Sequence, residues 1–338
     1  MSALLDDPLL PHKSRAGGGG APLAVPRGRP RRIGLPQRAL AGFATTLSEL
    51  CGPRETEAFG ILMYHRICEP IAGRAQPTWN VSPARFEQQL EGLLRRGFEA
   101  WPLREVLAHR RDGRPIPRKA FVITFDDVYE NVYLNAYPVL RRLELPATLF
   151  LATAYLDSTR PFPSDDWSEA GRGNVPYTTW QPITTDECRE MHKSGLIELA
   201  AHTHTHADFR GQPHELVADL RKCQRVLRER FGVERATFAF PYGNKNDGFA
   251  SGELSAAAEE AGMLCALTTE GELVRPGDGP FDWGRFAAEQ HDTAATLAAK
   301  LNGWHTAVRA LGRTMLRRQP RRERGQPYAG DDSETERT

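Results

Sequence analysis

The sequence predicts an α/β fold with a parallel sheet, arranged either as a barrel or as an open, doubly wound sheet. The first observation is that short apolar runs alternate with helical patterns through the middle of the 338-residue chain. The runs expected to form buried strands are Phe59–Tyr64, Ala120–Phe125, Ala147–Ala152, Ile197–Ala201, Thr237–Phe240 and Leu264–Thr268. The helical patterns cover residues 83–96, 103–111, 131–143, 184–194, 214–231 and 253–262. Neighbouring strands that are joined through helices run parallel to one another.

The second observation concerns the residues at the ends of the predicted helices. Ser82 precedes Pro83, which gives an N-cap followed by proline at the first helical position. Thr185, followed by two acidic residues, is expected to be another N-cap. Glycine favours the left-handed conformation in which many helices end. Glycines follow several of the predicted helices, at Gly97, Gly195, Gly232 and Gly262.

The composition is that of a soluble protein with an ordinary core, since 40% of the residues are hydrophobic and 26% are charged. A net charge of +1 gives no reason to expect nucleic acid as a partner. The five cysteines are scattered, which argues against a disulfide framework and against a cysteine-based zinc site. No signal-peptide pattern and no apolar stretch of the ~20 residues that span a membrane is found. We therefore expect a cytoplasmic protein without a transmembrane segment.

The two ends of the chain differ in composition from its middle. Residues 1–57 are rich in Gly, Pro and Arg and are expected to be a flexible extension, with a short helix possible around Arg38–Leu50. Residues 58–305 are expected to form the main folded domain. Residues 294–316 have the pattern of an amphipathic helix that covers the core, and peripheral membrane contact through its basic end is an alternative. Residues 306–338 are expected to comprise that basic helix end and a disordered tail.

The third observation is that polar side chains follow three of the predicted strands. Asp126 and Asp127 come directly after the strand at 120–125, and three histidines at positions 202, 204 and 206 follow the strand at 197–201. A Pro-Tyr-Gly sequence begins at Pro241, where another strand ends. In a (β/α) barrel, catalytic groups come from the carboxyl ends of the strands, which lie on one face.

One carboxylate and two imidazoles suit a catalytic metal site, because such a ligand set leaves coordination positions open. Asp127, His202 and His206 are the candidate ligands. Zinc and non-haem iron are both compatible with them. The alternatives are a helix N-cap for the aspartates and an exposed polar loop for the histidines.

With these residues the sequence resembles the polysaccharide deacetylase family, carbohydrate esterase family four, whose catalytic part is the NodB homology domain. The Thr-Phe-Asp-Asp motif stands at Thr124–Asp127, and the His-Ser/Thr-x-x-His motif stands at His202–His206. The Arg-x-Pro-Tyr motif is represented by Ala239–Tyr242. The resemblance extends from Ile61–Arg66 through Asn80–Pro83 to about Trp304.

This resemblance implies a distorted (β/α) barrel of about seven parallel strands and a deacetylation that depends on a divalent metal. Zinc is the expected ion, with cobalt, nickel or iron as alternatives. The resemblance makes Asp126 the general base, and Asp127, His202 and His206 the metal ligands. The backbone N–H of Tyr242 would stabilise the tetrahedral oxyanion.

Two positions depart from the family pattern. The arginine of the third motif, which orients the base, is replaced by Ala239. Family members of exopolysaccharide biosynthesis show similar replacements and supply an arginine from the fourth motif, for which Arg285 is the candidate. The usual Leu-x-His of the general acid is not recognisable, and His291 is the nearest candidate in order. His204, inside the second motif, occupies a position that varies in the family.

Several residues are expected to contact a carbohydrate substrate. Pro241 and Tyr242 follow one strand, and His65 ends the first strand. Aromatic side chains in long loops offer surfaces for sugar stacking. The candidates in such loops are Trp79, Trp167 and Trp180, with a carboxylate from Asp165 or Asp166.

These expectations favour an enzyme that removes N-acetyl groups from N-acetylhexosamine units of a polysaccharide or of its lipid-linked precursor. A deacetylase of a small acetylated molecule or of an O-acetyl ester is an alternative. A third possibility, from another class, is a catalytically inactive carbohydrate-binding relative. The presence of both Asp126 and a full ligand set argues against this third possibility.

Overall fold

A computed structural model describes residues 35–55, 57–77, 79–162, 165, 167 and 175–308 of the chain. Its main sheet is entirely parallel, with the strand order β10-β1-β5-β6-β7-β8-β9 and β4 paired beside β5. The strands are β1 (Gly60–Tyr64), β4 (Glu99–Ala100), β5 (Ala120–Phe125), β6 (Ala147–Leu151), β7 (Ile197–Ala201), β8 (Phe238–Ala239), β9 (Ala266–Leu267) and β10 (Phe286–Ala287). A separate parallel pair consists of β2 (Arg66–Ile67) and β3 (Asn80–Val81).

The sheet curls into a barrel, and the segment before β10 spans the gap between its two edges. Leu267 of β9 pairs with Trp283 in a parallel bridge. Two residues beyond Arg285, in β10, Ala287 pairs with Met63 of β1. This segment therefore contacts β9 first and β1 immediately afterwards, which places Arg285 between them.

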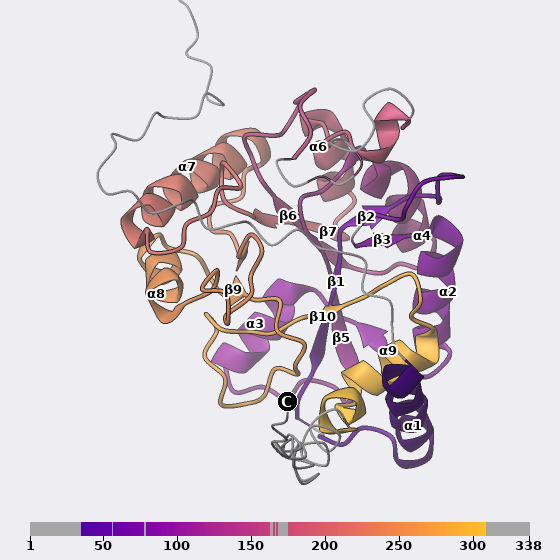
Figure 1. Ribbon diagram of the computed structural model, residues 1–338. Coiled ribbons are helices and arrows are strands. Elements are labelled where there is room, and N and C mark those ends of the chain that lie inside the picture. The colour runs from indigo at the N-terminus through magenta and orange to yellow at the C-terminus, as the bar shows by residue number, and fades with distance from the viewer. Residues whose placement is uncertain are drawn as a thin grey trace, which may run out of the picture.

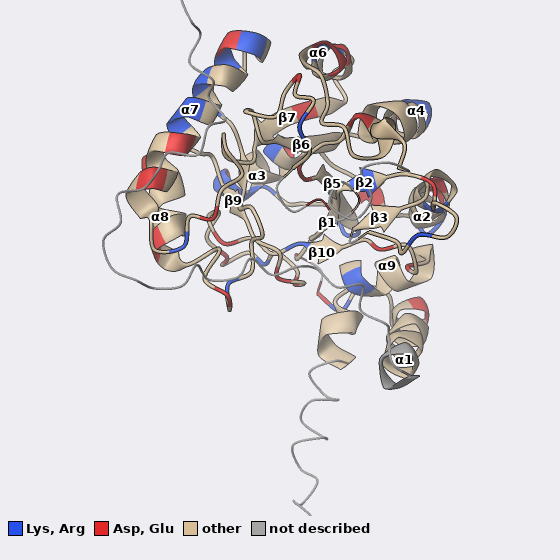
Figure 2. Ribbon diagram, turned by 45° about the horizontal axis from the view of Figure 1, so that its top comes forward, with Lys and Arg blue, Asp and Glu red and all other residues tan. Residues whose placement is uncertain are grey.

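The helices cover the outside of the barrel, with α7 and α8 on one side and α2 and α4 on the other (Figure 1). The α-helices are α1 (Leu35–Cys51), α2 (Pro83–Leu94), α3 (Leu103–Arg111), α4 (Tyr137–Arg142), α6 (Thr185–Lys193), α7 (Pro213–Phe231), α8 (Gly252–Glu260) and α9 (Ala294–Leu301). A π-helix, η1 (Val132–Ala136), and a 3-10 helix, η2 (Tyr177–Thr179), complete the elements. Figure 2 shows that charged residues lie mainly on the outer helices, whereas the strands carry few.

The central strands are apolar because both of their faces are covered. Every residue of β1, β5 and β6 is buried. Side chains on one face of these strands pack against the inner faces of the helices, and those on the other face form a second cluster that includes Leu103 and Val106 of α3. This arrangement is typical of parallel sheets, whose strands read as apolar runs and not as alternating patterns.

Two predicted helices differ locally from the expectation. The N-cap of α6 is Thr184 and not Thr185, since the Thr184 hydroxyl accepts a hydrogen bond from the Glu187 N–H and the Glu187 carboxylate accepts one from the Thr184 N–H. The helix predicted over 131–143 is divided into η1 and α4. Pro138 has no N–H to bond the carbonyl of Leu134, so regular α-helical bonding is interrupted there.

The amphipathic helix predicted over 294–316 is also interrupted. It ends as α9 at Leu301, and Gly303 follows with a φ of 81°. Residues 304–308 are helical again, and the rest of the predicted helix lies outside the described residues. Trp304 and Val308 pack against the inner side of α1, together with Ala299.

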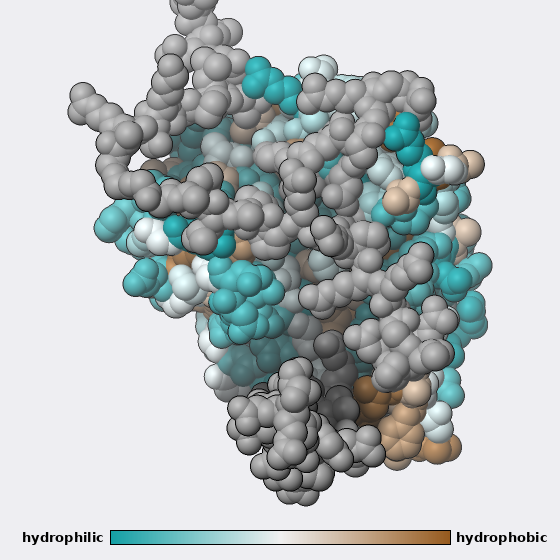
Figure 3. All heavy atoms as spheres, viewed as in Figure 1, coloured by the Kyte–Doolittle hydropathy of each residue, from teal (hydrophilic) through white to brown (hydrophobic). Residues whose placement is uncertain are grey.

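Helix α1 belongs to the segment that was expected to be flexible, yet it packs against α9 (Figure 1). The expected flexibility of residues 1–57 therefore does not hold for residues 35–51. The outer side of α1 exposes Phe43 and Leu50. Figure 3 shows a hydrophobic surface, in brown, where Figure 1 places this helix. No helix within the described ranges is both long and apolar enough to cross a membrane.

Candidate active site

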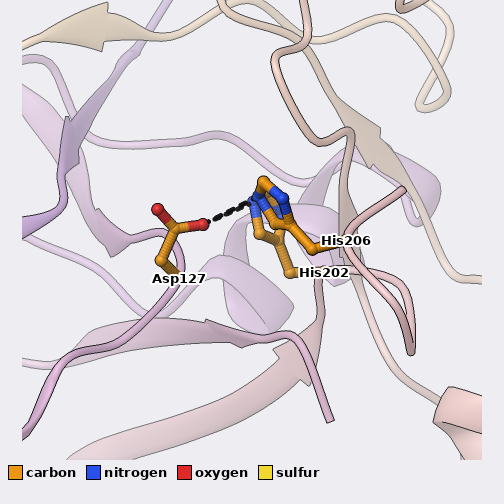
Figure 4. A group of neighbouring side chains, drawn as sticks. All are labelled: Asp127, His202 and His206. Atoms are coloured by element: carbon orange, nitrogen blue, oxygen red, sulfur yellow. Dashed lines mark ion pairs between the residues drawn. The ribbon is translucent and has the colours of Figure 1, made fainter. Parts of the chain in front are cut away.

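The carboxyl-terminal ends of two strands, β5 and β7, bring the three predicted metal ligands together. Asp127 follows β5, while His202 and His206 follow β7. One ligand atom from each of the three residues lies within 4.8 Å of the others. The Nε2 atom of His206 is 2.9 Å, and that of His202 is 3.4 Å, from Oδ1 of Asp127. Figure 4 shows both imidazole rings turned toward the carboxylate.

The backbone around this group adopts left-handed conformations that non-glycine residues rarely take. The φ angles are 62° for Asp127, 66° for Thr203, 53° for His206 and 63° for Tyr242. Such conformations cost about 1–3 kcal/mol each and persist where the surrounding structure holds them. Their concentration at the ends of β5, β7 and β8 marks this face of the barrel as a functional site.

The three side chains fit a divalent cation. The Nδ1 atom of His202 is 2.8 Å from the carbonyl oxygen of Ala239, so that Nδ1–H donates there and Nε2 keeps its lone pair toward Asp127. Among the described residues, no donor meets the buried Oδ1 of Asp127 in hydrogen-bond geometry. Burial raises the pKa of Asp127, but the charge of His206 and the contacts with both imidazoles hold it well below its usual range. A carboxylate and two imidazole nitrogens that converge in this way match a metal site with open positions.

Asp126 lies beside this group and is held by Arg285. The guanidinium donates from both terminal nitrogens, with Nη1 at 2.5 Å from Oδ1 and Nη2 at 2.7 Å from Oδ2 of Asp126. Arg285 is fully buried and also donates to the carbonyl oxygen of Thr268 at 3.1 Å. Burial raises the pKa of Asp126, but the charges of Arg285 and His202 outweigh it, so the pKa is lowered overall. The structure thus places Arg285 where the arginine missing at Ala239 would have acted.

His65 is the second titratable neighbour of Asp126. Its Nε2 atom lies 3.9 Å from Oδ2 of Asp126. Burial lowers the pKa of His65, and the charge of Asp126 opposes this effect only in part. The ring of Trp79 stacks on that of His65, with centroids 5.5 Å apart and planes inclined by 15°. Trp79 is 37% exposed, so its indole borders both the site and solvent.

The end of β8 contributes Tyr242 to the same site. Its ring contacts that of His206 edge-on, with centroids 5.2 Å apart, and also contacts Phe249. Gly243 follows with a φ of 52°, and a Cβ atom there would lie 2.8 Å from the side chain of Thr269. Glycine is therefore required at this turn. Pro241 is buried, which leaves it little surface for the predicted substrate contact.

Three of the predicted residues, His291, Trp167 and Asp165, lie elsewhere or serve packing. His291 pairs with Glu289 at 3.0 Å, and among the described residues no contact joins it to Asp126 or to the metal ligands. Trp167 is 3% exposed and its Nε1–H donates to the carbonyl oxygen of Ala75, so the expectation of sugar stacking is wrong for this residue. Asp165 is buried in an ion pair with Arg66, and a carboxylate engaged in this way does not face a substrate groove.

Trp180 is only partly buried and meets the exposed ring of Tyr177 at 4.6 Å. No contact in the described part of the chain links Trp180 to Asp126 or to the metal ligands.

The residues that sequence reasoning did not assign include Thr203, whose hydroxyl accepts a hydrogen bond from the His206 N–H at 3.0 Å. The second motif contains this threonine, so a signal for it was present.

Comparison with known proteins supports this reading of the fold. Residues 113–263 match the family model described as polysaccharide deacetylase. A poly-beta-1,6-N-acetyl-D-glucosamine N-deacetylase of Staphylococcus aureus (strain MRSA252) is 26% identical over 236 residues, which cover 67% of this chain and 73% of that protein. The protein with the same description from Staphylococcus epidermidis (strain ATCC 35984) is 24% identical over 235 residues, with the same coverage.

Two solved structures share the fold. The Streptococcus pyogenes deacetylase PplD in complex with acetate matches with a TM-score of 0.60 and 20% identity, covering 73% of this chain and 99% of that one. The structure of IcaB from Ammonifex degensii matches with a TM-score of 0.60 and 22% identity, covering 74% of this chain and 98% of that one. These likenesses confirm the predicted NodB-type (β/α) barrel. The family match over residues 113–263 and the similarity to the staphylococcal N-deacetylases agree with the resemblance of the motifs at the strand ends to the polysaccharide deacetylase family.

Proposed function

We propose that this protein is a metal-dependent hydrolase that removes N-acetyl groups from N-acetylhexosamine units of a polysaccharide. The observation that carries the proposal is the pairing of Asp126 with Arg285 directly beside the ligand group of Asp127, His202 and His206. A base next to a metal site is what amide hydrolysis needs, whereas carbohydrate binding alone needs neither. The relatives described as poly-beta-1,6-N-acetyl-D-glucosamine N-deacetylases suggest that this polymer is the substrate.

Asp127, His202 and His206 would hold the ion, and zinc suits two imidazoles and one carboxylate. When bound, a divalent ion supplies polarisation of the amide carbonyl and a lower pKa for a coordinated water. Iron, cobalt and nickel bind similar ligand sets, so the identity of the ion is a matter for metal analysis.

Asp126 would act as the general base and accept a proton from the attacking water at one carboxylate oxygen. A lowered pKa keeps its carboxylate ionised and ready to accept that proton at neutral pH. Arg285 binds both carboxylate oxygens, which fixes the plane of the carboxylate and leaves its other lone pairs for the water. The arginine is thus a positioning residue and not itself a proton donor.

The backbone N–H of Tyr242 would donate to the oxyanion that forms when the amide carbonyl is attacked, because a rigid donor stabilises charge at the moment it develops. His65, whose Nε2 atom lies beside Asp126, would pass the proton that Asp126 has taken from the water on to the leaving amine, and it takes the role first sought in His291. The products would be acetate and a free amino group on the sugar.

Trp79 would bind the sugar ring next to the reacting amide, since its indole covers His65 and is partly exposed. Trp79→Ala should raise KM for an oligosaccharide substrate with a smaller change in kcat. Steady-state kinetics check this, and an unchanged KM would exclude the stacking role.

Acetate release tests the proposed function directly. The purified protein would be assayed with chitooligosaccharides, with a poly-β-1,6-N-acetylglucosamine oligomer, and with small acetylated amines and O-acetyl esters, each with and without a chelator. Chelator-sensitive acetate release from a hexosamine oligomer is expected. Release from the small substrates alone would favour the small-molecule deacetylase. Zinc binding without release from any substrate would favour a binding protein.

A further inference from the structure

The loop of residues 202–206 carries two of the three proposed metal ligands and has to hold their Nε2 atoms at a fixed separation. Thr203 and His206 both have positive φ angles, of 66° and 53°. The hydrogen bond from the His206 N–H to the Thr203 hydroxyl closes the loop on itself. A loop of this shape needs external contacts to be a rigid ligand platform, because strained conformations persist only where the surroundings hold them.

One set of external contacts comes from the end of β6. The N–H of Thr153 donates to the carbonyl oxygen of Thr203 at 3.3 Å, and the N–H of Ala154 donates to that of His204 at 2.9 Å. The side chain of Thr153 also bonds Nδ1 of His204 at 2.9 Å. These contacts fix the carbonyl side of the loop.

The other side of the loop is held by one carboxylate, that of Asp219. Its Oδ1 atom accepts a short hydrogen bond from the N–H of His204 and a longer one, of 3.4 Å, from the N–H of Thr205. Its Oδ2 atom accepts the hydroxyl of Thr205 at 2.6 Å. Bonds to an ionised acceptor are roughly twice as strong as those between neutral groups. The carboxylate therefore fixes the loop residues that lie between the two ligands.

Helix α7 gives Asp219 a fixed position. The helix starts with a proline in its first turn, ends at Gly232 with a φ of 72°, and packs its inner face through Leu216, Leu220, Cys223 and Leu227. Asp219 lies within this span, on a long helix that is well anchored against the barrel. No motif of the sequence singles out this residue, since it lies 13 positions beyond the second histidine ligand by the numbering of the chain.

The geometry points to Asp219 as the positioning residue of the metal site. Through Thr205 and the backbone of His204, it sets the distance and orientation at which His202 and His206 present Nε2 to the ion. The inference rests on the proposed function, in that it presumes the ion bound by Asp127 and the two histidines. Residues outside the ligand set that orient ligands typically contribute 10- to 100-fold to metal affinity.

Zinc affinity of the full-length chain tests this role without any substrate. The dissociation constant would be measured by competition with a chromogenic chelator for wild type, Asp219→Ala and Asp219→Asn. We expect a constant about 10–100-fold higher for Asp219→Ala. The dissociation constant of Asp219→Asn should lie between those of wild type and Asp219→Ala, because the amide retains one acceptor oxygen but loses the charge. Glu229→Ala, which removes an exposed carboxylate from the same helix, is the matched control and should bind zinc as wild type does.

Circular dichroism of the metal-free proteins separates this role from a purely structural one. A structural role alone would lower Tm of the metal-free protein and leave the zinc affinity of the folded molecules unchanged, which would overturn the inference. Thr205→Val removes one partner of Asp219 from the loop side and provides a milder variant should Asp219→Ala fail to fold. It should weaken zinc binding in the same direction, and wild-type affinity in both Thr205→Val and Asp219→Asn would equally overturn the inference. Wild-type protein that binds no zinc would contradict the metal site itself, a different outcome from zinc binding that ignores Asp219.

Discussion

In the described part of this chain, two groups of three potential metal ligands lie within 4.8 Å of one another, and of these two only one has the surroundings of a metal site. The first is Asp127, His202 and His206, and the second is Glu289, His291 and Asp292. In the second group the Nζ atom of Lys300 lies 2.6 Å from Oδ2 of Asp292. About half of the side chain of His291 is exposed, and its imidazole pairs with Glu289 of the same group.

The first group contrasts with the second in every one of these respects. Both histidines are buried, and within the described part of the chain no lysine or arginine pairs with Asp127. The cation of the site, Arg285, is instead bound to Asp126. The comparison teaches that residue types and proximity do not define a metal site. What distinguishes it is a carboxylate left without a protein cation and imidazoles oriented by neighbours.

The largest difference between the two groups should appear when one histidine of each is removed. His202→Ala should lose both bound zinc and deacetylase activity, because two ligands no longer enclose the ion. His291→Ala should retain both. Metal content by atomic emission and acetate release by the protein check this pair. Loss of zinc in His291→Ala would show that the second group binds the metal after all.

The next largest effect separates metal binding from chemistry. Asp126→Asn should lower kcat by about 10²–10⁴-fold, the range of general base catalysis, while the zinc content stays near that of wild type. Glu289→Gln, the corresponding change in the second group, is the control and should leave kcat unchanged. Near-normal turnover by Asp126→Asn would refute the assignment of the base.

A smaller effect on activity is expected when Arg285, the cation beside the first group, is replaced. Arg285→Met leaves Asp126 buried without its cation, and burial then raises the pKa of Asp126. The base is ionised only above that pKa, so the acidic limb of the kcat/KM profile should move to higher pH. Activity at neutral pH should fall by about 10–100-fold, as for other groups that orient a reactive residue.

Arg285→Lys keeps the charge but not the paired hydrogen bonds, so its acidic limb should move less than that of Arg285→Met. A pH–rate profile of both variants distinguishes the two contributions. An acidic limb that stays in place in Arg285→Met would mean that Arg285 does not control Asp126.

Replacement of Lys300, the cation that pairs with Asp292 of the second group, should have the smallest effect on activity but a clear effect on stability. Burial raises the pKa of Asp292, while Lys300 lowers it by more, so that its pKa in the folded protein lies below the usual value. The ion pair of Asp292 with Lys300 therefore stabilises the folded protein fully at pH values above the pKa that Asp has in the unfolded chain. This stabilisation is lost as the pH falls through the lower pKa that Asp292 has in the folded protein. Lys300→Met should lower the free energy of unfolding at neutral pH by about 3–5 kcal/mol.

The difference in stability between Lys300→Met and wild type should narrow on acidification, because a protonated Asp292 no longer needs a cation. Urea denaturation at neutral and at acidic pH measures this, with the exposed Lys193→Met as the control. A difference that is equal at both pH values would show that the pairing with Asp292 does not cause the destabilisation.

The sequence was sufficient for those parts of the molecule whose signal is local. The central strands are buried on both faces and read as apolar runs, so β1, β5, β6 and β7 lie where they were predicted. Among the strands of two residues, β8 and β9 lie within predicted runs, whereas β2, β3, β4 and β10 were not predicted, because strands this short show no period. The sequence around a loop tryptophan does not indicate whether its side chain is buried, which is why Trp167 was wrongly expected at the surface.

By itself, the sequence determined a parallel α/β fold, its order of elements and the candidate ligand set, because each depends on residue types next to one another along the chain. The barrel, as opposed to an open sheet, was implied by the family resemblance of the motifs. Only the tertiary structure decided which charges meet. It joins Arg285 to Asp126 across 159 positions, directs Lys300 to Asp292, and brings Asp219 of α7 against the loop of the histidines. Pairings of this kind depend on how helices and strands pack in space, and an ion pair over such separations leaves no periodic trace in the chain. The same packing leaves the group of Asp127, His202 and His206 available to a metal ion, whereas it pairs Asp292 of the other group with Lys300.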